Sequence, residues 1–214
     1  RLVGSEMCIR DSLTTGSAIY FMKHVLRNGS LLGLFSMMKM FPVIIALIFT
    51  PILVKKTGSM QKVNFWGYVI SDILGIFLII FAMQKNLPMM LLFMFLKGTF
   101  AGTMSGTLNA LIAEISGYTY RTKGVHIDGM MFSCSSLGVK VGGGIGTAAV
   151  GWLLHAAGYA GKAATQTAAA TNMIFSMYIT IPVILGVVIT ILLGLMKVEK
   201  ENKRIDMERA EQAD

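Results

Sequence analysis

Five long apolar stretches constrain this chain more than any other feature of its sequence. A helix needs roughly 20 apolar residues to cross a hydrocarbon core about 30 Å thick. Strands of a membrane β-barrel would instead alternate apolar and polar residues over about 10 positions. The sequence therefore predicts an all-α membrane protein with five complete spans. These are residues 31–54, 63–82, 88–116, 128–155 and 172–196.

The charged residues separate the apolar stretches and do not form a patch. Only 14% of the residues are charged, whereas soluble domains carry roughly 25%. The formal net charge is +8, but nucleic-acid-binding proteins gather their basic residues on one face, with aromatic residues among them. Two cysteines are too few for a disulfide framework. The pattern excludes an ordinary soluble domain and argues against a nucleic-acid partner.

The two ends of the chain differ from the bundle that we predict over residues 13–196. Residues 1–12 lack a starting methionine and a signal-peptide core, and we interpret them as adapter-derived, non-native sequence. Residues 13–27 are too short and too polar for a span, so we expect the last turns of a truncated first helix. Residues 197–214 contain five basic and six acidic residues and are predicted to form a charged cytoplasmic tail.

The lysines and arginines between the spans predict their orientation. Alternate connections, together with the tail, contain ten basic residues, and the connections on the opposite side contain four. Cytoplasmic loops of membrane proteins carry the excess of Lys and Arg. We therefore expect a multi-pass protein of the cell (inner or plasma) membrane with its C-terminus in the cytoplasm.

Ionisable side chains inside the spans are candidates for function, because inserting each one costs at least about 2.5–3.5 kcal/mol. Lys140 lies near the middle of its span, and Ser136 precedes it by one turn on the same helical face. Lys140 therefore either faces a solute cavity or forms an ion pair with a neighbouring helix. Lys97 and Asp72 also lie well inside their spans. Asp72 either carries a proton or forms a structural salt bridge with a lysine.

Small residues recur at fourfold spacing in two spans, and this spacing lets helix backbones approach closely. We interpret both ridges as packing surfaces; the alternative is that they let helices slide during transport. The ridges consist of Gly98, Gly102 and Gly106, and of Gly138, Gly142 and Gly146.

Enzyme signatures are absent from the sequence. It contains no GxxxxGK[ST] phosphate loop, no HExxH and no CxxC pair, and its three histidines lack ligand spacing. The sequence therefore predicts no catalytic residues, no metal site and no cofactor.

The region from residue 112 to 159 contains a spaced set of residues typical of one transporter family. They are Ala113, Tyr118, Gly124, Gly129, Ser133, Lys140, Gly142, Gly151, Trp152, Gly158 and Tyr159. In these residues the region resembles the glycoside–pentoside–hexuronide:cation symporters, the melibiose-carrier group of the major facilitator superfamily. This resemblance implies the C-terminal six-helix bundle of a twelve-helix transporter, from a truncated helix seven to helix twelve. It also implies that the main site for the coupling cation, sodium or proton, lies in a missing N-terminal six-helix half.

The resemblance also implies roles for individual side chains. Lys140 corresponds to a family lysine that joins cation binding to sugar binding. Ser136 matches a sugar-facing polar position one turn away. Ser105 occupies a position where some members have an aromatic residue that stacks on the sugar. With Asp72 and Lys97, these residues form the expected substrate-binding or coupling site.

The cytoplasmic gate loop departs from the family pattern. Glu114 stands where the family has its first acid, and Gly117 replaces the second acid. His126 replaces an arginine and Asp128 replaces a glutamate, whereas Tyr118 matches. The loop therefore has fewer charges, and we expect either a looser latch or one in which a pH-sensitive His126 replaces a permanent charge.

The expected function is cation-coupled symport of a sugar or glycoside by alternating access. The expected partners are the lipid bilayer, a small-molecule solute and the missing N-terminal half. One alternative is a major facilitator carrier of another solute, which deep lysines without matching acids would make anionic. A second alternative is a small membrane scaffold or channel subunit.

Overall fold

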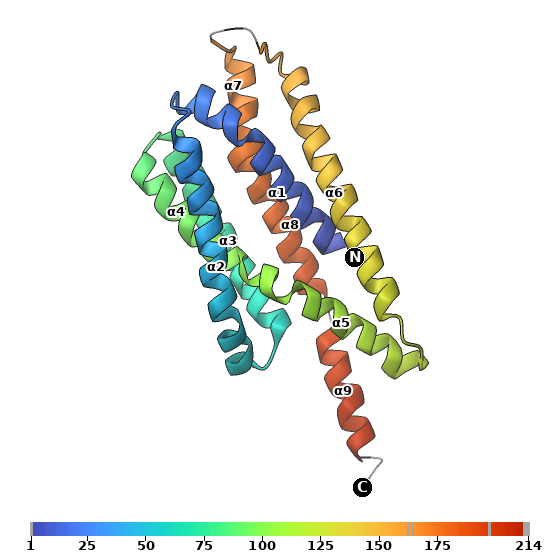
Figure 1. The fold of residues 1–214 in the computed structure, drawn as a ribbon. Helices are drawn as coiled ribbons and strands as arrows, with labels where there is room; N and C mark the ends of the chain where they lie inside the picture. Colours follow the sequence, from blue (N-terminus) through green and yellow to red (C-terminus); the bar gives the residue numbers. More distant parts are fainter. Residues whose placement is uncertain (1, 162, 164, 197, 212–214) are drawn as a thin grey trace.

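The computed structural model describes residues 2–161, 163, 165–196 and 198–211, and every regular element in this part of the chain is helical (Figure 1). The elements are α1 (Leu2–Tyr20), η1 (Phe21–Val25), α2 (Leu31–Thr57), α3 (Met60–Met83), α4 (Leu87–Ala101), α5 (Thr103–Lys123), α6 (Asp128–Ala156), α7 (Ala168–Phe175), η2 (Ser176–Thr180), α8 (Ile181–Leu195) and α9 (Val198–Glu211), where η marks a π-helical segment.

Five helical segments among the described residues are long and apolar enough to cross a membrane, which confirms the predicted all-α membrane fold. Each contains one of the apolar stretches found in the sequence. The segments are Leu31–Thr57, Met60–Met83, Leu87–Lys123, Asp128–Ala156 and Ala168–Glu208.

Two of the predicted spans are not regular α-helices throughout. The span predicted over 88–116 divides at Gly102 into α4 and α5. The span predicted over 172–196 contains the π-helical segment η2, which ends directly before α8, whose second residue is Pro182. Proline has no backbone N–H to donate, and wider helical turns commonly accommodate such a loss.

The helices pack in an order that differs from their order in the chain. Helix α1 lies between α6 and α8, and α3 lies between α8 and α4, which in turn contacts α2 (Figure 1). Helix α5 crosses one end of the bundle and contacts α9, which projects from that end. Residues far apart in the sequence, on α3 and α8 above all, therefore face each other inside the bundle.

The first glycine ridge packs against α2. A Cβ added to Gly102 would lie 2.7 Å from the Cβ of Ala46, and one added to Gly98 would lie 3.1 Å from the Cβ of Pro42. Contacts this short leave no space for a side chain. This ridge therefore serves as a packing surface.

Helix α1 is longer than the sequence predicted. We expected residues 1–12 to lie outside the fold and 13–27 to hold only the end of a helix. In the structure the helix begins at Leu2 and continues through η1 to Val25, while residue 1 lies outside the described part of the chain. The weak periodicity of this segment did not prevent helix formation. Its adapter origin stays a prediction.

Candidate functional site

A buried carboxylate joins α3 to α8. The side chain of Asp72 is 8% exposed, and its Oδ2 accepts a hydrogen bond of 2.6 Å from the hydroxyl of Thr190. Its Oδ1 is buried and has no hydrogen-bond partner among the described residues. Gly186 makes this approach possible, because a Cβ there would lie 2.4 Å from Oδ1. The contact therefore leaves one acceptor of the carboxylate available inside the bundle.

An amine from α4 lies near this carboxylate. The Nζ of Lys97 is 3.3 Å from the position that a Cβ on Gly75 would occupy. Gly75 follows Asp72 by three residues and so lies on the same side of α3. No ion pair between Lys97 and Asp72 is present in the described part of the chain. The structure therefore brings these two predicted site residues to one face without pairing them directly.

Lys97 also borders a small cavity of about 110 Å³ between α1, α2, α4 and η2. Lys39 of α2 borders the same cavity, and its Nζ donates a 2.8 Å hydrogen bond to the hydroxyl of Thr15. The remaining wall is largely apolar, although Arg10 and Asp11 reach it from the segment that we interpret as non-native. Arg10, Lys39 and Lys97 thus give this cavity three cationic side chains, against the single carboxylate of Asp11 among its described lining residues.

Lys140 and Ser136 lie on an exposed face of α6, apart from this cavity. Both side chains are exposed, as are their apolar neighbours Leu137 and Val141, which are 63% and 51% exposed. Within the described residues, Lys140 takes part in no hydrogen bond or ion pair. Among the described residues, therefore, no neighbouring helix provides the ion pair that was the alternative expected for Lys140.

Ser105 lies in the first turn of α5, just after the break at Gly102, and its side chain is exposed. Its backbone N–H donates a 3.0 Å bond to the carbonyl of Gly102. Ser105 does not border the cavity that holds Lys97. The predicted site residues therefore fall into two groups: buried Asp72 with half-buried Lys97, and the exposed Ser105, Ser136 and Lys140.

The predicted gate residues lie at the end of the bundle that carries α9. The backbone oxygen of Glu114 accepts a 3.0 Å bond from the side-chain amide of Asn202, and its Oε1 lies 3.5 Å from the same nitrogen. Nδ1 of His126 lies 3.8 Å from Oδ2 of Asp128, and the His126 ring stacks on Tyr120. These contacts connect the loop to neighbouring residues of this same chain.

Tyr118, the remaining predicted gate residue, is half-buried on α5. Its backbone oxygen accepts a 2.8 Å bond from the hydroxyl of Thr122.

The docking of the tail was missed by the sequence analysis. Arg121 of α5 binds both carboxylate oxygens of Asp206, at 2.7 and 3.0 Å. Glu199 and Asn202 of the tail also contact the bundle, so α9 uses residues spaced three and four apart. That spacing places them on one face of a helix, which is the signal that could have predicted the docking.

Comparison with known proteins identifies transporters. The family described as MFS/sugar transport protein matches residues 9–200. An isoprimeverose transporter of Lactiplantibacillus pentosus is 27% identical over 182 residues, covering 85% of this chain and 37% of the relative. A protein of Escherichia coli provisionally named glycoside/cation symporter YagG is 24% identical over 205 residues, covering 93% of this chain and 44% of the relative.

A third relative, an uncharacterized 29.9 kDa protein of Pseudescherichia vulneris, is 27% identical over 132 residues, covering 61% of this chain and 48% of the relative. This chain thus spans less than half the length of each of these relatives. No solved structure matches the chain significantly. The comparisons support transport and point away from enzymes.

Proposed function

The chain belongs to the MFS/sugar transport protein family, and from this premise we propose that it forms one wall of a secondary transporter for a sugar or glycoside, coupled to sodium or protons. The family match and the names of two relatives support this proposal. In such carriers the solute site lies near the bilayer midplane, between two repeats that rock against each other.

The depth and the exposure of Lys140 are the observations that carry the proposal. It lies 12 residues after the start of α6, which places it about 18 Å along the helix axis and far from either end. An ammonium group at that depth is costly against lipid and normally faces a bundle interior or a wet cavity. Because the side chain is exposed and unpaired among the described residues, we assign it to a solute cleft completed by further helices.

Asp72 and Lys97 have a separate role in the proposal. Asp72 keeps one unpartnered oxygen beside α8, and Lys97 lies on the same side of α3. A proton or cation that binds this carboxylate would alter the contact between α3 and α8. We propose that Asp72 and Lys97 couple helix packing to solute binding at the Lys140 face.

Transport assays on the complete carrier that contains this chain test the proposal. Uptake of labelled melibiose, xylosides and glucuronides into proteoliposomes would be measured with and without sodium and pH gradients. We expect K140A to reduce gradient-driven uptake at least tenfold, and K85A, at an exposed turn outside the spans, to leave it unchanged. Undiminished coupled uptake by K140A would remove this lysine from the mechanism.

A specific observation favours an anionic solute as the second candidate. Arg10, Lys39 and Lys97 border one cavity, where Asp11 is the only carboxylate among the described lining residues, and Lys140 is unpaired in the described part of the chain. An excess of cationic side chains over carboxylates suits a uronide or a sulfonated sugar. Preference for glucuronides and sulfosugars over neutral glycosides in the same assay would select this candidate.

We also propose that the α9 end of the bundle faces the cytoplasm. Ten basic residues lie in the connections and tail at this end, against four at the other, and this bias sets the orientation of membrane proteins. A reporter enzyme that is active only in the cytoplasm, fused after the tail, should be active. An inactive fusion that becomes active when moved to the 84–86 turn would reverse the orientation.

A further inference from the structure

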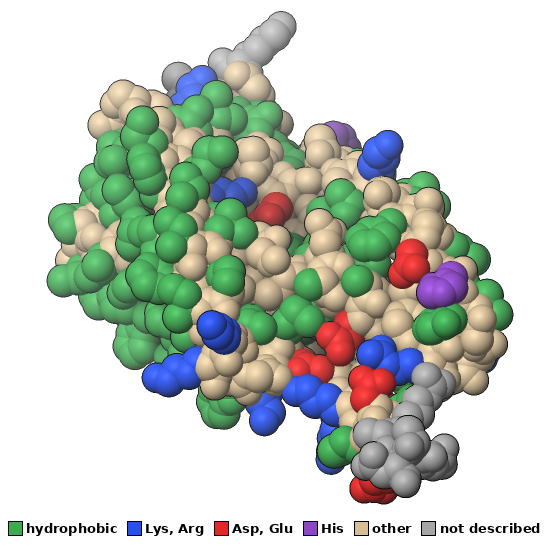
Figure 2. All heavy atoms as spheres, turned by 60° about the horizontal axis from the view of Figure 1, so that its bottom comes forward, with side chains coloured by type: hydrophobic (Ala, Val, Ile, Leu, Met, Phe, Trp, Pro, Cys, Tyr) green, Lys and Arg blue, Asp and Glu red, His purple; other side chains and the backbone are tan. Residues whose placement is uncertain are grey.

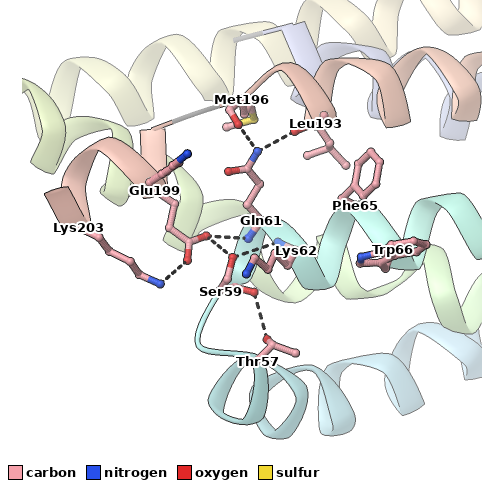
Figure 3. Close-up of a pocket in the computed structure, with 12 residues that line it drawn as sticks. Thr57, Ser59, Gln61, Lys62, Phe65, Trp66, Leu193, Met196, Glu199 and Lys203 are labelled. Carbon is pink, nitrogen blue, oxygen red and sulfur yellow. Dashed lines mark hydrogen bonds and ion pairs between the residues drawn. The ribbon is translucent and has the colours of Figure 1, made fainter.

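A cavity of about 580 Å³ lies where the start of α3 meets the junction between α8 and α9 (Figure 3). The rings of Phe65 and Trp66 line one part of it. The side chains of Lys62, Lys200 and Lys203 line another part. The cavity therefore combines an apolar wall with a cluster of amines.

The only carboxylate among the described lining residues is already neutralised. Glu199 is 7% exposed and accepts bonds of 2.9 Å from the Ser59 hydroxyl and 3.0 Å from the backbone N–H of Gln61. Lys203 pairs with it at 3.2 Å. These bonds, drawn in Figure 3, satisfy the acid and fix the wall of the cavity.

Another side chain holds the end of α8 against α3. The side-chain amide of Gln61 donates to the backbone oxygens of Leu193, at 2.9 Å, and of Met196. Both carbonyls belong to the C-terminal end of α8, where helix carbonyls have no regular intrahelical partner, and the Leu193 oxygen also accepts a 3.3 Å bond from the backbone N–H of Met196. The cavity is therefore built from fixed backbone and not from a loosely packed end.

Two amines remain after this pairing. The ammonium groups of Lys62 and Lys200 are exposed and take part in no hydrogen bond or ion pair within the described residues. With Lys203 matched to Glu199, the cavity carries two uncompensated positive charges. Such a site is complementary to an anion.

The cavity opens beside an exposed apolar surface of α3 and α8, which we call the Trp66 flank. Trp66 is 61% exposed, and the same flank continues with Ile73 on α3 and Ile191 and Leu195 on α8, which are 51%, 57% and 70% exposed. Figure 2 shows basic side chains gathered at the end of the bundle that carries α9, next to apolar surface. Tryptophan favours the headgroup level of a bilayer. The two free amines therefore lie at that level, directly beside a surface for acyl chains.

We propose that this cavity is a binding site for an anionic phospholipid, with the headgroup phosphate between Lys62 and Lys200 and the acyl chains along the Trp66 flank. Basic pockets between membrane helices recognise such headgroups. The adjacent apolar flank distinguishes a lipid from a soluble phosphate, which would gain nothing from it. The site is independent of the transported solute and concerns the protein's attachment to its bilayer.

The two tryptophans of the chain allow a direct test. Trp66 lines the cavity, whereas Trp152 is exposed near the opposite end of the bundle, on the last turns of α6. The purified chain would be reconstituted in phosphatidylcholine carrying increasing fractions of brominated phosphatidylglycerol or brominated phosphatidylcholine. Fluorescence quenching would be measured in W152F, which reports from Trp66 alone, and in W66F, which reports from Trp152 alone.

We expect brominated phosphatidylglycerol to quench Trp66 at a lower lipid fraction than the zwitterionic lipid does, and Trp152 to show a smaller preference. In the W152F background, K62Q/K200Q should reduce the preference by about fivefold for each lysine removed. The matched control K55Q/K56Q removes two charges from the same end but from outside the cavity, and should change the preference less than twofold.

Three outcomes would overturn the proposal. Equal losses in the two double-lysine variants would indicate diffuse surface attraction without a site. Equal preferences at Trp66 and Trp152 would show that lipid is not selected at this end. Relief of Trp66 quenching by soluble glycerol phosphate, at the concentration of the brominated lipid, would assign the cavity to a free phosphate compound.

Discussion

Replacing Gly186 with alanine tests how α8 holds the Asp72 carboxylate. The added Cβ would lie 2.4 Å from Oδ1 of Asp72, whereas carbon–oxygen contacts normally reach about 3.3–3.6 Å. The carboxylate or the helix must therefore move by about 1 Å. That movement acts directly on the 2.6 Å hydrogen bond from Thr190 to Oδ2.

The size of the effect follows from three contributions. Overpacking costs about 1–3 kcal/mol. Weakening a hydrogen bond between membrane helices adds about 0.6 kcal/mol and at most about 1.7 kcal/mol. The better helix propensity of alanine offsets up to about 1 kcal/mol of this destabilisation. We expect G186A to lower the free energy of unfolding by about 1–3 kcal/mol.

Unfolding by sodium dodecyl sulfate in mixed micelles, followed by circular dichroism, would measure this change. G144A is the matched control, because Gly144 lies inside α6 and a Cβ there would meet no atom within 4 Å. It should be neutral or slightly stabilising through helix propensity alone. A loss of stability in G144A as large as that in G186A would mean that the Asp72 contact is not the cause.

A double-mutant cycle then isolates the contact. D72A removes the oxygen that the new methyl group would strike, so adding G186A to D72A should have little further effect. The two substitutions should therefore be coupled by at least about 1 kcal/mol. Equal destabilisation by G186A in the wild-type and D72A backgrounds would refute the contact geometry.

Three further predictions concern helix packing and the tail. N64A removes the buried 2.6 Å bond from the Asn64 amide to Thr107, and the same unfolding assay should record a loss of about 0.6 and at most about 1.7 kcal/mol. E199A breaks a buried carboxylate contact and should speed tryptic cleavage within α9 severalfold, whereas D206N breaks an exposed pair and should change the rate less than twofold. G102V places a side chain where even a Cβ has a 2.7 Å contact, and it should lower the yield of folded, monodisperse protein on size-exclusion chromatography.

The spans could be predicted because a long apolar run is a sufficient signal by itself. The stretch predicted over 31–54 appears as Leu31–Thr57, and the one over 63–82 appears as Met60–Met83. The break at Gly102 could not be predicted in this way, since Leu87–Lys123 as a whole is still apolar enough to cross a membrane, although the residues just after Gly102 are mostly small or polar. Hydropathy reports whether a segment enters the membrane and is insensitive to local changes of helical geometry.

The hydrogen-bond partners of the buried polar side chains could not be predicted from the sequence. We predicted that Asp72 either pairs with a lysine or carries a proton, and the structure gives it the hydroxyl of Thr190, 118 positions later in the chain. That contact depends on α3 lying beside α8 and on the rotation of both helices. Periodicity identifies the face of a helix, but the order of helices in the bundle decides which face it meets.

The two glycine ridges differ in what they contact, and the difference bears on why α1 extends beyond the helix end expected from the sequence. The ridge on α4 and α5 contacts side chains, as Gly102 does with the Cβ of Ala46 and Gly106 does with Leu47. The ridge on α6 contacts backbone instead. Cβ atoms on Gly142 and Gly146 would each lie 2.7 Å from a backbone oxygen, that of Ser5 or of Ile9.

A backbone oxygen is present whatever the side chain, so a smooth glycine surface accepts any helix that can approach closely. The segment over 2–12 therefore packs without the apolar periodicity that sequence reasoning requires. In this contact α1 supplies backbone atoms and the glycines of α6 supply the space for them. It follows that substitutions at Gly142 and Gly146 should disturb the docking of α1 more than conservative substitutions at the residues they contact.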